Sequence, residues 1–386
     1  MNVVGPTSVG VNLLWLRPGH VGGTESYARR VLRSLSNHDG DADADLDSDL
    51  TLHLFGTTPG IEAVKPSGQR SSMVSHVVRP GPIPRAQRVV VERTVLPSAT
   101  RAVELDVLHH LGGTVPFDST VPSVVTIHDL QPLDQPENFS PAKVRFLRSA
   151  IPAAIERSAV IATPSNWVRE QIISRFDLDP RRVQTVSAFA EPVDLAGPIE
   201  RSMRLEAIVA DGPIVLFPAM TLGHKNHSFL FDAFGDALKR DPDLQLISVG
   251  AIGRDHDALV AKAAYVSPRI RMLGHVSKHD LDVLYRSADA VVFPSRYEGF
   301  GLPVLEAQHY GVPVISSNVT ALPEVAGDGA LLLDPDDRTA WADAMVKRFS
   351  PVERSQAVAR GFKNAARYSL NSTAQQQQRV YSQAIA

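Results

Sequence analysis

Two glutamates separated by seven residues are the side chains of this chain with the clearest chemistry. They enclose a glycine-containing segment that runs from Glu298 through Gly-Phe-Gly-Leu-Pro-Val-Leu to Glu306. Ionised carboxylates accept hydrogen bonds from sugar hydroxyls. Taken alone, Glu306 is explained equally well as a charge that complements a helix dipole. A structural reason for Glu298 is weaker, because it lies in a glycine loop, so we expect it to bind a ligand.

The segments around this motif predict how the glutamates are positioned. Residues 290–293 and 312–315 are apolar runs typical of buried strands. Between them we expect a loop and then a helix, because Pro303 fits the first turn of a helix. In such strand–loop–helix–strand units the ligand lies beyond the carboxyl ends of the strands. The free N–H groups of the helix start suit a phosphate.

Lys225 and a pair of glycines are further candidates for phosphate binding. Lys225 follows an expected strand at 214–217 and precedes an expected helix, so its ammonium can pair with a phosphate. Gly22 and Gly23 stand between an expected strand at 9–16 and a helix. This turn also suits an anion, although a glycine pair serves equally well as a plain connection.

His128 and Asp129 follow the apolar run 121–127. The carboxyl end of a strand is where ligand-binding and catalytic groups collect in α/β folds. A single histidine in this place is also commonly a structural hydrogen-bonding group. The pair is therefore a candidate whose weight depends on the other motifs.

The sequence predicts no metal site and no bound cofactor. Residues 39–49 place Asp at every second position but lack the glycine and final glutamate of a calcium loop, so we expect a solvated loop. His224 and His227 have no carboxylate partner in their motif. We also expect no Asp-x-Asp pair after a strand where a diphosphate-bound metal would be held.

The combination of E-G-F-G-L-P-V-L-E-A with a following G-V-P-V-I resembles the donor-site signature of retaining GT-B glycosyltransferases of the glycosyl transferases group 1 type. The resemblance covers nearly the whole chain and is strongest over 214–336. It implies an α/β fold of the GT-B class, with two doubly wound Rossmann-like domains facing a cleft. The N-terminal acceptor-side domain would span 1–190, with a C-terminal helix at 369–386 packing back on it. The nucleotide-sugar-donor domain would span 201–368.

The resemblance also implies roles for individual residues. Catalysis would involve His128 by the anomeric carbon, Lys225 at the diphosphate and Glu298 at the sugar hydroxyls. Donor-binding residues would be Gly22, Gly23, Asp129, Arg254, His275, Val276, Phe300, Gly301, Leu302 and, at the ribose, Glu306. The chain departs from the family in one place, because no Arg occurs between Phe217 and Lys225. Arg254 is the candidate replacement for that second cation.

The composition limits the remaining classes of function. The chain has 386 residues, enough for two domains, and a formal net charge of −3, which gives no reason to expect nucleic-acid binding. Cysteine is absent, which excludes disulfides and thiol nucleophiles and fits a cytoplasmic protein. We expect no signal peptide and no membrane span of roughly 18 apolar residues.

One basic stretch stands out between residues 79 and 101. It contains five arginines, opposed by Glu92: Arg79, Arg85, Arg88, Arg93 and Arg101. Part of the stretch is expected to be an amphipathic helix. It is either a solvated helix face or a patch for anionic lipid head groups or a phosphate-bearing acceptor.

The sequence thus predicts a retaining, metal-independent hexosyltransferase. Its donor would be a nucleoside-diphosphate sugar, with GDP-mannose as the first guess. Its acceptor would be a glycan or a polyprenyl- or other lipid-linked molecule in surface polysaccharide or glycolipid assembly, used in the cytoplasm or at the inner face of the cell membrane. The alternatives are a sugar-nucleotide epimerase of the same fold and a non-catalytic nucleotide-sugar-binding subunit. The sequence fixes neither the base and sugar nor the acceptor, linkage and oligomeric state.

Overall fold

The computed structural model describes residues 7–19, 22–36, 50–65, 73–79, 81, 83–197, 199–347 and 351–386. The aspartate-rich loop expected at 39–49 lies outside the described residues. The chain divides into two compact units. Unit 1 comprises Met1–Phe189 and Tyr368–Ala386, and unit 2 comprises Ala190–Arg367. Each unit is described by itself.

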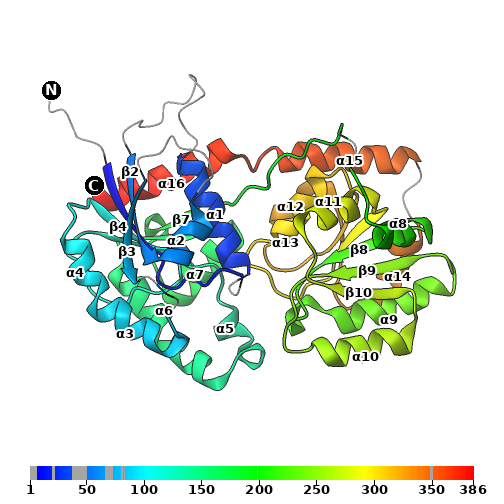
Figure 1. The fold of residues 1–386 in the computed structure, drawn as a ribbon, viewed down its shortest axis with the longest axis horizontal. Helices are drawn as coiled ribbons and strands as arrows, with labels where there is room; N and C mark the ends of the chain where they lie inside the picture. Colours follow the sequence, from blue (N-terminus) through cyan, green and yellow to red (C-terminus); the bar gives the residue numbers. More distant parts are fainter. Residues whose placement is uncertain are drawn as a thin grey trace. The chain divides into compact units, whose positions relative to one another are not determined.

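Unit 1 is built on a parallel sheet with the strand order β3-β2-β1-β4-β5-β6-β7 (Figure 1). Its strands are β1 (Thr7–Asn12), β2 (Leu50–Thr57), β3 (Met73–Arg79), β4 (Val107–His110), β5 (Ser123–Thr126), β6 (Val160–Thr163) and β7 (Val183–Thr185). Its helices are α1 (Gly23–Ser36), α2 (Thr58–Val64), α3 (Arg85–Thr94), α4 (Leu96–Arg101), α5 (Gln131–Asp134), α6 (Pro141–Arg157), α7 (Asn166–Phe176) and α16 (Leu370–Ile385).

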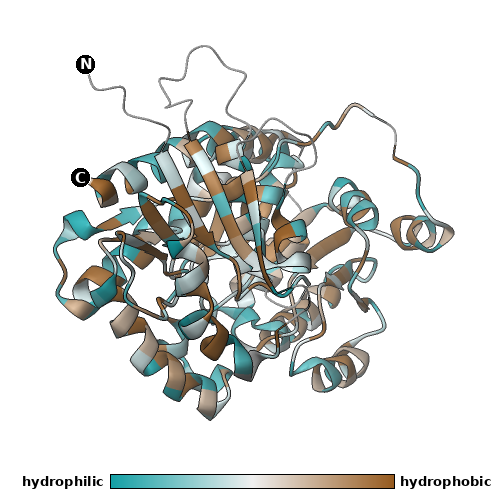
Figure 2. Ribbon diagram, turned by 60° about the vertical axis from the view of Figure 1, so that its left-hand side comes forward, coloured by the Kyte–Doolittle hydropathy of each residue, from teal (hydrophilic) through white to brown (hydrophobic). Residues whose placement is uncertain are grey.

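The central strands of unit 1 are apolar because helices cover the sheet on both sides. Every residue of β4, β5 and β6 is buried, as expected for a parallel sheet. Figure 2 shows strands in which hydrophobic and hydrophilic residues are mixed. Ser140 and Ser165 cap α6 and α7, each accepting a hydrogen bond from a backbone N–H in the first helical turn.

The first strand is shorter than predicted. β1 ends at Asn12, not at residue 16, and the chain then turns. The indole of Trp15 donates to the Asn12 carbonyl at 3.0 Å within this turn. The side chains of residues 13–16 are buried although they lie outside the strand, which is why the apolar run is longer than β1. The helix expected after the glycine pair begins within that pair, at Gly23.

The last helix, α16, belongs to unit 1 although unit 2 precedes it in the chain. It packs against α1 and against β4, β5 and β6. The Tyr381 hydroxyl lies 2.9 Å from Nδ1 of His109 on β4. The hydroxyl of Thr373 donates to the Ser187 carbonyl at 2.7 Å, and the side-chain oxygen of Gln376 accepts from the Ser187 N–H at 2.8 Å.

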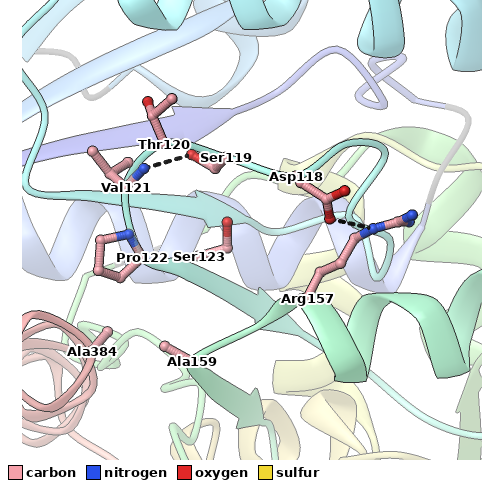
Figure 3. Close-up of a pocket in the computed structure, with 9 residues that line it drawn as sticks. All are labelled: Asp118, Ser119, Thr120, Val121, Pro122, Ser123, Arg157, Ala159 and Ala384. Atoms are coloured by element: carbon pink, nitrogen blue, oxygen red, sulfur yellow. Dashed lines mark hydrogen bonds and ion pairs between the residues drawn. The ribbon is translucent and has the colours of Figure 1, made fainter.

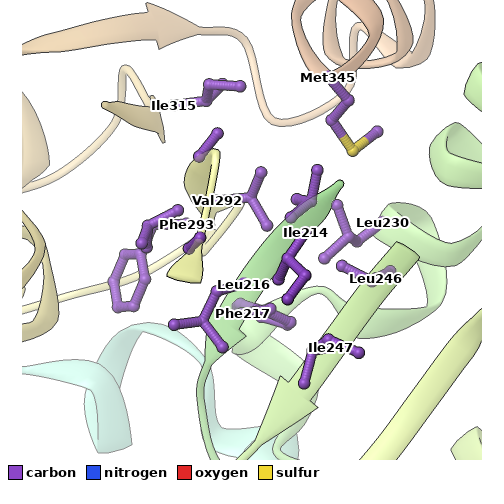
Figure 4. Close-up of a cluster of buried hydrophobic side chains, with 14 of the residues drawn as sticks. Ile214, Leu216, Phe217, Leu230, Leu246, Ile247, Val292, Phe293, Ile315 and Met345 are labelled. Atoms are coloured by element: carbon purple, nitrogen blue, oxygen red, sulfur yellow. The ribbon is translucent and has the colours of Figure 1, made fainter. Parts of the chain in front are cut away.

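Unit 2 contains a second parallel sheet, in the order β10-β9-β8-β11-β12-β13. Its strands are β8 (Ile214–Pro218), β9 (Gln245–Val249), β10 (Ile270–Gly274), β11 (Ala290–Phe293), β12 (Val314–Ser317) and β13 (Ala330–Leu333). Its helices are α8 (Met203–Ala210), α9 (His227–Leu238), α10 (His256–Val266), α11 (Lys278–Ser287), α12 (Leu302–His309), α13 (Leu322–Ala326), α14 (Arg338–Lys347) and α15 (Pro351–Ala365). Apolar side chains of the sheet, α9 and α14 meet in one buried core (Figure 4).

Both sheets have the doubly wound topology, so the α/β fold predicted from the sequence is confirmed. In each sheet the winding direction reverses at one place, between β1 and β4 in unit 1 and between β8 and β11 in unit 2. Ligands of such folds bind outside the carboxyl ends of the strands at this switch point. Within the described ranges no helix combines the length and the apolar character needed to cross a membrane.

Candidate functional site

The candidate site of unit 2 lies at the switch point of its sheet. The loop after β8 carries Lys225, and the loop after β11 carries Glu298. The Lys225 ammonium and the Glu298 carboxylate form an ion pair of 2.5 Å, and these side chains are only 16% and 12% exposed. The Arg296 N–H also donates to the His224 carbonyl at 2.8 Å. The two loops are therefore fastened together by one side-chain and one backbone contact.

A third loop, which follows β12, holds the backbone of Glu298. The Glu298 N–H donates to Oγ1 of Thr320 at 3.1 Å. The Glu298 carbonyl accepts a hydrogen bond from the Ala321 N–H at 3.4 Å. The position of this carboxylate thus depends on three loops from neighbouring strands.

Helix α12 begins directly after this loop, as the glycine motif predicts. Gly301 has φ +103°, and a Cβ atom there would lie 2.7 Å from a methyl group of Leu322, so glycine is needed both for the backbone and for the space. Pro303 occupies the first helical turn. The first N–H groups of the helix have no intrahelical acceptor and can bind an anion. Phe300 before it is 9% exposed.

Glu306 lies in the second turn of α12 and is half-buried. The hydroxyl of Tyr285 on α11 donates to its carboxylate at 3.5 Å. Tyr285 in turn stacks on Tyr310, with ring centroids 4.6 Å apart. The two motif glutamates thus have different surroundings, since Glu298 faces a cation and Glu306 a phenol.

The histidines beside Lys225 are neutral at pH 7. Burial and, to a smaller extent, the positive charge of Lys225 lower the pKa of His224 to about 4, although the Glu298 carboxylate opposes this shift. Burial followed by the Lys225 charge likewise lowers the pKa of His227 to about 4. His224 therefore does not supply a second positive charge near neutral pH, although it directly precedes Lys225.

Three predicted donor-binding residues follow the strands on the other side of β8 from β11. Arg254 follows β9, is exposed, and lies 3.5 Å from the Asp255 carboxylate. His275, which is exposed, and Val276, which is half-buried, follow the edge strand β10. The structure places all three at the correct edge of the sheet but does not bring them into the Lys225–Glu298 contact.

In unit 1 the helix that follows the glycine turn contacts His128. Gly22 has φ +61°, and its carbonyl accepts the first N–H groups of α1, the helix that Gly23 begins. Tyr27 of this helix packs edge-on against the His128 ring, with centroids 5.0 Å apart. Asp129 accepts a hydrogen bond from the backbone N–H of Gln131 at 3.0 Å.

His128 is held as a neutral imidazole. Its Nε2 lies 2.8 Å from the carbonyl oxygen of Leu111, so Nε2 carries the proton and Nδ1 is left as an acceptor. Burial lowers the pKa of His128 to about 4, and the bond to Leu111 opposes that shift. At neutral pH the residue can accept a proton or a hydrogen bond, but it is not a cation.

The expectation that no Asp-x-Asp pair follows a strand at this edge is wrong. Asp334 and Asp336 directly follow β13. Asp336 is bound by Arg296, which lowers the pKa of its carboxyl. Asp334 accepts the Asp336 N–H at 2.8 Å. Both carboxylates therefore have protein partners, one in the loop after β11 and one within the loop after β13.

The basic stretch is less uniform than its sequence indicates. Arg88 on α3 forms an ion pair of 3.2 Å with Glu92, whose side chain is 2% exposed. Glu92 also accepts a hydrogen bond at 3.1 Å from Asn12 at the end of β1. The guanidinium of Arg93 donates to the Pro116 carbonyl at 3.2 Å. Glu92 thus connects α3 to the sheet, and Arg88 neutralises this buried carboxylate within the helix instead of adding to a free basic surface.

A hollow in unit 1 lies at the opposite edge of the sheet (Figure 3). It has a volume of about 460 Å³ and is lined by residues that include Ser123 and Ala159, at the amino ends of β5 and β6. Its charged groups, Arg157 and Asp118, pair with each other at 2.8 Å. This edge is not where ligands of doubly wound folds bind.

Comparison with known proteins identifies a matching family model and several similar proteins. Residues 212–350 match the family model described as glycosyl transferases group 1. The O-antigen chain mannosyltransferase B of Escherichia coli is 33% identical over 254 residues, which are 64% of this chain and 66% of that protein. The D-inositol 3-phosphate glycosyltransferase of Corynebacterium glutamicum (strain R) is 32% identical over 247 residues, 60% of this chain and 59% of that protein. Each alignment covers less than two thirds of the relative.

A solved structure shares the fold over nearly its whole length. The crystal structure of Anabaena HepE in complex with UDP and glucose matches with a TM-score of 0.72 at 17% identity, covering 97% of this chain and 99% of that one. The protein therefore has the GT-B fold of two Rossmann-like units. The segment 212–350, which contains Lys225, Glu298 and Glu306, carries the glycosyl transferases group 1 domain.

Sequence reasoning missed two residues of the unit 2 site, Thr320 and Tyr285. Thr320 follows β12, and a polar residue after a buried strand is a weak signal that could have been used. Tyr285 lies in the middle of α11 and gave no signal of its own, because an aromatic residue there fits a helix core equally well. Their roles became visible only through their contacts with the two glutamates.

Proposed function

We propose that the protein is a retaining glycosyltransferase that moves a hexose from a nucleoside-diphosphate sugar to a glycan or lipid-linked acceptor. The observation that carries the proposal is the buried Lys225–Glu298 pair at the switch point between β8 and β11. It places a cation, a carboxylate and the start of α12 where a ligand with a phosphate and hydroxyl groups would be bound. The named relatives, which include an O-antigen chain mannosyltransferase, support GDP-mannose as the first donor to test.

The proposed chemistry follows from the charges that develop during transfer. The departing diphosphate gains negative charge while the sugar gains oxocarbenium character, and the acceptor hydroxyl attacks from the same face. Fixed donors that meet the growing charge lower the barrier. Lys225 and the N–H groups of Phe300 and Gly301 would do so in unit 2, and the turn at Gly22 would do so in unit 1.

The remaining residues would hold the substrate. Glu298 would accept hydrogen bonds from the sugar hydroxyls, and Glu306 would accept them from the ribose. His128, with Nδ1 as an acceptor, would lie by the anomeric carbon, with Asp129 next to it. We propose that no divalent metal takes part, because these protein groups supply the charge stabilisation.

Where the acceptor is lipid-linked, we propose that the protein meets it at the inner face of the cell membrane. The exposed residues of α3 and α4, including Val90 and Arg101, would touch the lipid head groups. Sedimentation with anionic vesicles at low and high salt tests this contact, because electrostatic binding weakens as salt rises. Absence of sedimentation at low salt would refute it.

The test of the function is incubation with a panel of labelled sugar nucleotides, with and without lipid-linked acceptors. Transfer that requires an acceptor and keeps the anomeric configuration supports the proposal. Release of nucleoside diphosphate with a changed free sugar and no acceptor would identify an epimerase. Binding of a donor without turnover under every condition would identify a non-catalytic subunit. The Glu298→Gln variant is the matched control, since it changes the site by one oxygen-to-NH₂ exchange.

A further inference from the structure

Thr320 has a backbone conformation that its residue type does not favour. It lies in the loop between β12 and α13, and its φ is +57°. The other described non-glycine residues with positive φ are Asp177 and Asn226, whose types tolerate this region, whereas a β-branched residue there is an outlier. Such strained residues persist where the surroundings fix them, and they cluster at functional sites.

The contacts of Thr320 lead directly to Glu298. The Thr320 hydroxyl donates its proton to the Val319 carbonyl at 2.7 Å, which leaves its oxygen to accept the Glu298 N–H at 3.1 Å. The next residue, Ala321, donates its N–H to the Glu298 carbonyl at 3.4 Å. Both polar groups of the Glu298 backbone are therefore held by this loop, while the side chain pairs with Lys225.

We propose that Thr320 is a positioning residue that sets the Glu298 carboxylate and thereby the choice of sugar. The inference rests on the proposed function. A carboxylate distinguishes two sugars that differ at one hydroxyl only if the carboxylate is held within hydrogen-bonding distance of that hydroxyl. The sugar that lacks the hydroxyl at this place then leaves a buried polar group unpaired. The oxygen of Thr320 keeps Glu298 in place by accepting its N–H, and this need explains why the strained conformation is retained.

The experiment compares Thr320→Val, which keeps the side-chain shape and removes the hydroxyl, with Thr320→Ser, which keeps the hydroxyl. The measured quantity is the ratio of kcat/KM for two donors that share a base and differ at one sugar hydroxyl. We expect the ratio to fall about 10-fold or more in Thr320→Val, a modest part of the discrimination that a polar site achieves. Thr320→Ser should keep the wild-type ratio.

A control and a third variant separate positioning from stability. The hydroxyl of Thr57 in unit 1 also accepts a backbone N–H, that of Gly60 at 3.2 Å. Thr57→Val should therefore lower the melting temperature without changing the ratio. Thr320→Gly relieves the strain and lacks the hydroxyl, so it should remain folded and still lose selection, even if Thr320→Val does not fold.

The outcomes distinguish this inference from the function on which it rests. If the wild-type protein transfers no sugar from any donor, the proposed function fails and this inference with it. If the wild-type protein transfers sugar and the folded Thr320→Val or Thr320→Gly variant keeps the donor ratio, only the positioning role is overturned.

Discussion

Lys225 is the residue whose loss we expect to affect turnover more than donor affinity. Its ammonium would meet the diphosphate, and the charge there grows as the glycosidic bond breaks. Lys225→Ala should lower kcat by about 100- to 1,000-fold, roughly 3–4 kcal/mol, by analogy with loss of one preorganised charge-stabilising group. Steady-state kinetics with separate determination of donor affinity checks this. An equal loss of affinity with unchanged kcat would contradict the role.

Glu298 and Glu306 should differ in their effects, because one faces Lys225 and the other Tyr285. Glu298→Gln should weaken donor binding and turnover together and reduce selection between sugars. The reason is that the Glu298 carboxylate would hold the sugar in both the ground state and the transition state. Glu306→Gln should act mainly on donor affinity through the ribose. The measurement is kinetics with two donors of the same base and different sugars. Near-normal turnover with unchanged preference in Glu298→Gln would show that the site is wrongly assigned.

We predict that activity does not depend on a divalent metal. The Asp334–Asp336 pair is a reason to test this, because two carboxylates could bind one. We expect activity to survive excess chelator, because Asp336 is bound by Arg296 and the diphosphate charge is met by Lys225. Activity that is lost in chelator and restored by magnesium or manganese would refute this account. A parallel loss in Asp336→Asn would then locate the metal.

Sequence reasoning selects candidate residues most readily where the residue type alone limits their use. A lysine after a buried strand and a glutamate in a glycine loop indicate a polar ligand without any knowledge of their neighbours. The contact between Lys225 and Glu298 could not be predicted in this way, since 72 residues separate them in the chain. It depends on β8 and β11 being neighbours in the sheet.

At the scale of elements, α3 contacts the sheet through the buried carboxylate of Glu92, which accepts a hydrogen bond from Asn12 of β1 and pairs with Arg88 of the same helix. We expect Arg88→Ala to destabilise the protein by roughly 3 kcal/mol, because the buried carboxylate of Glu92 would lose its cation. Chemical denaturation measures the change in free energy of unfolding. Arg101→Ala, at an exposed position on α4, is the control and should have little effect. If the two variants are equally stable, Arg88 does not stabilise the buried carboxylate and is an ordinary solvated side chain.

The strands were easier to predict than several of the helices. β11 has the predicted bounds because an apolar run between polar residues marks a strand buried on both faces. Helix α10 was not predicted, and its exposed Val260 and Tyr265 show why. Its apolar residues do not mark one face, so the helical period is weak.

At the scale of the whole molecule, we expect the protein to lose stability in mild acid. Burial lowers the pKa values of five histidines from 6.5 to about 3 or 4: His109, His110, His128, His224 and His227. The unfolded chain therefore binds protons at a higher pH than the folded one. The contribution of these neutral rings to the free energy of unfolding is complete above pH 6.5 and is lost as the pH falls toward 4. Each histidine accounts for about 1.4 kcal/mol per unit by which its pKa is lowered.

Denaturant unfolding at pH 7, 5.5 and 4.5 checks this dependence. The His109→Gln variant should show a shallower fall, because one of the groups that bind protons only after unfolding is gone. A free energy of unfolding that does not fall between pH 7 and 4.5 would refute the prediction.

The return of α16 to unit 1 also affects the order in which the protein can be made. Domains commonly fold as units during synthesis, the N-terminal one first. Here the segment Ala190–Arg367 is continuous, whereas the first unit needs Tyr368–Ala386 to cover β4, β5 and β6. The ribosome therefore releases every residue of the second unit before the first unit has its last helix. The unit that is begun first is therefore completed after the second, and α16 can cover its sheet only once residues 190–367 have been made.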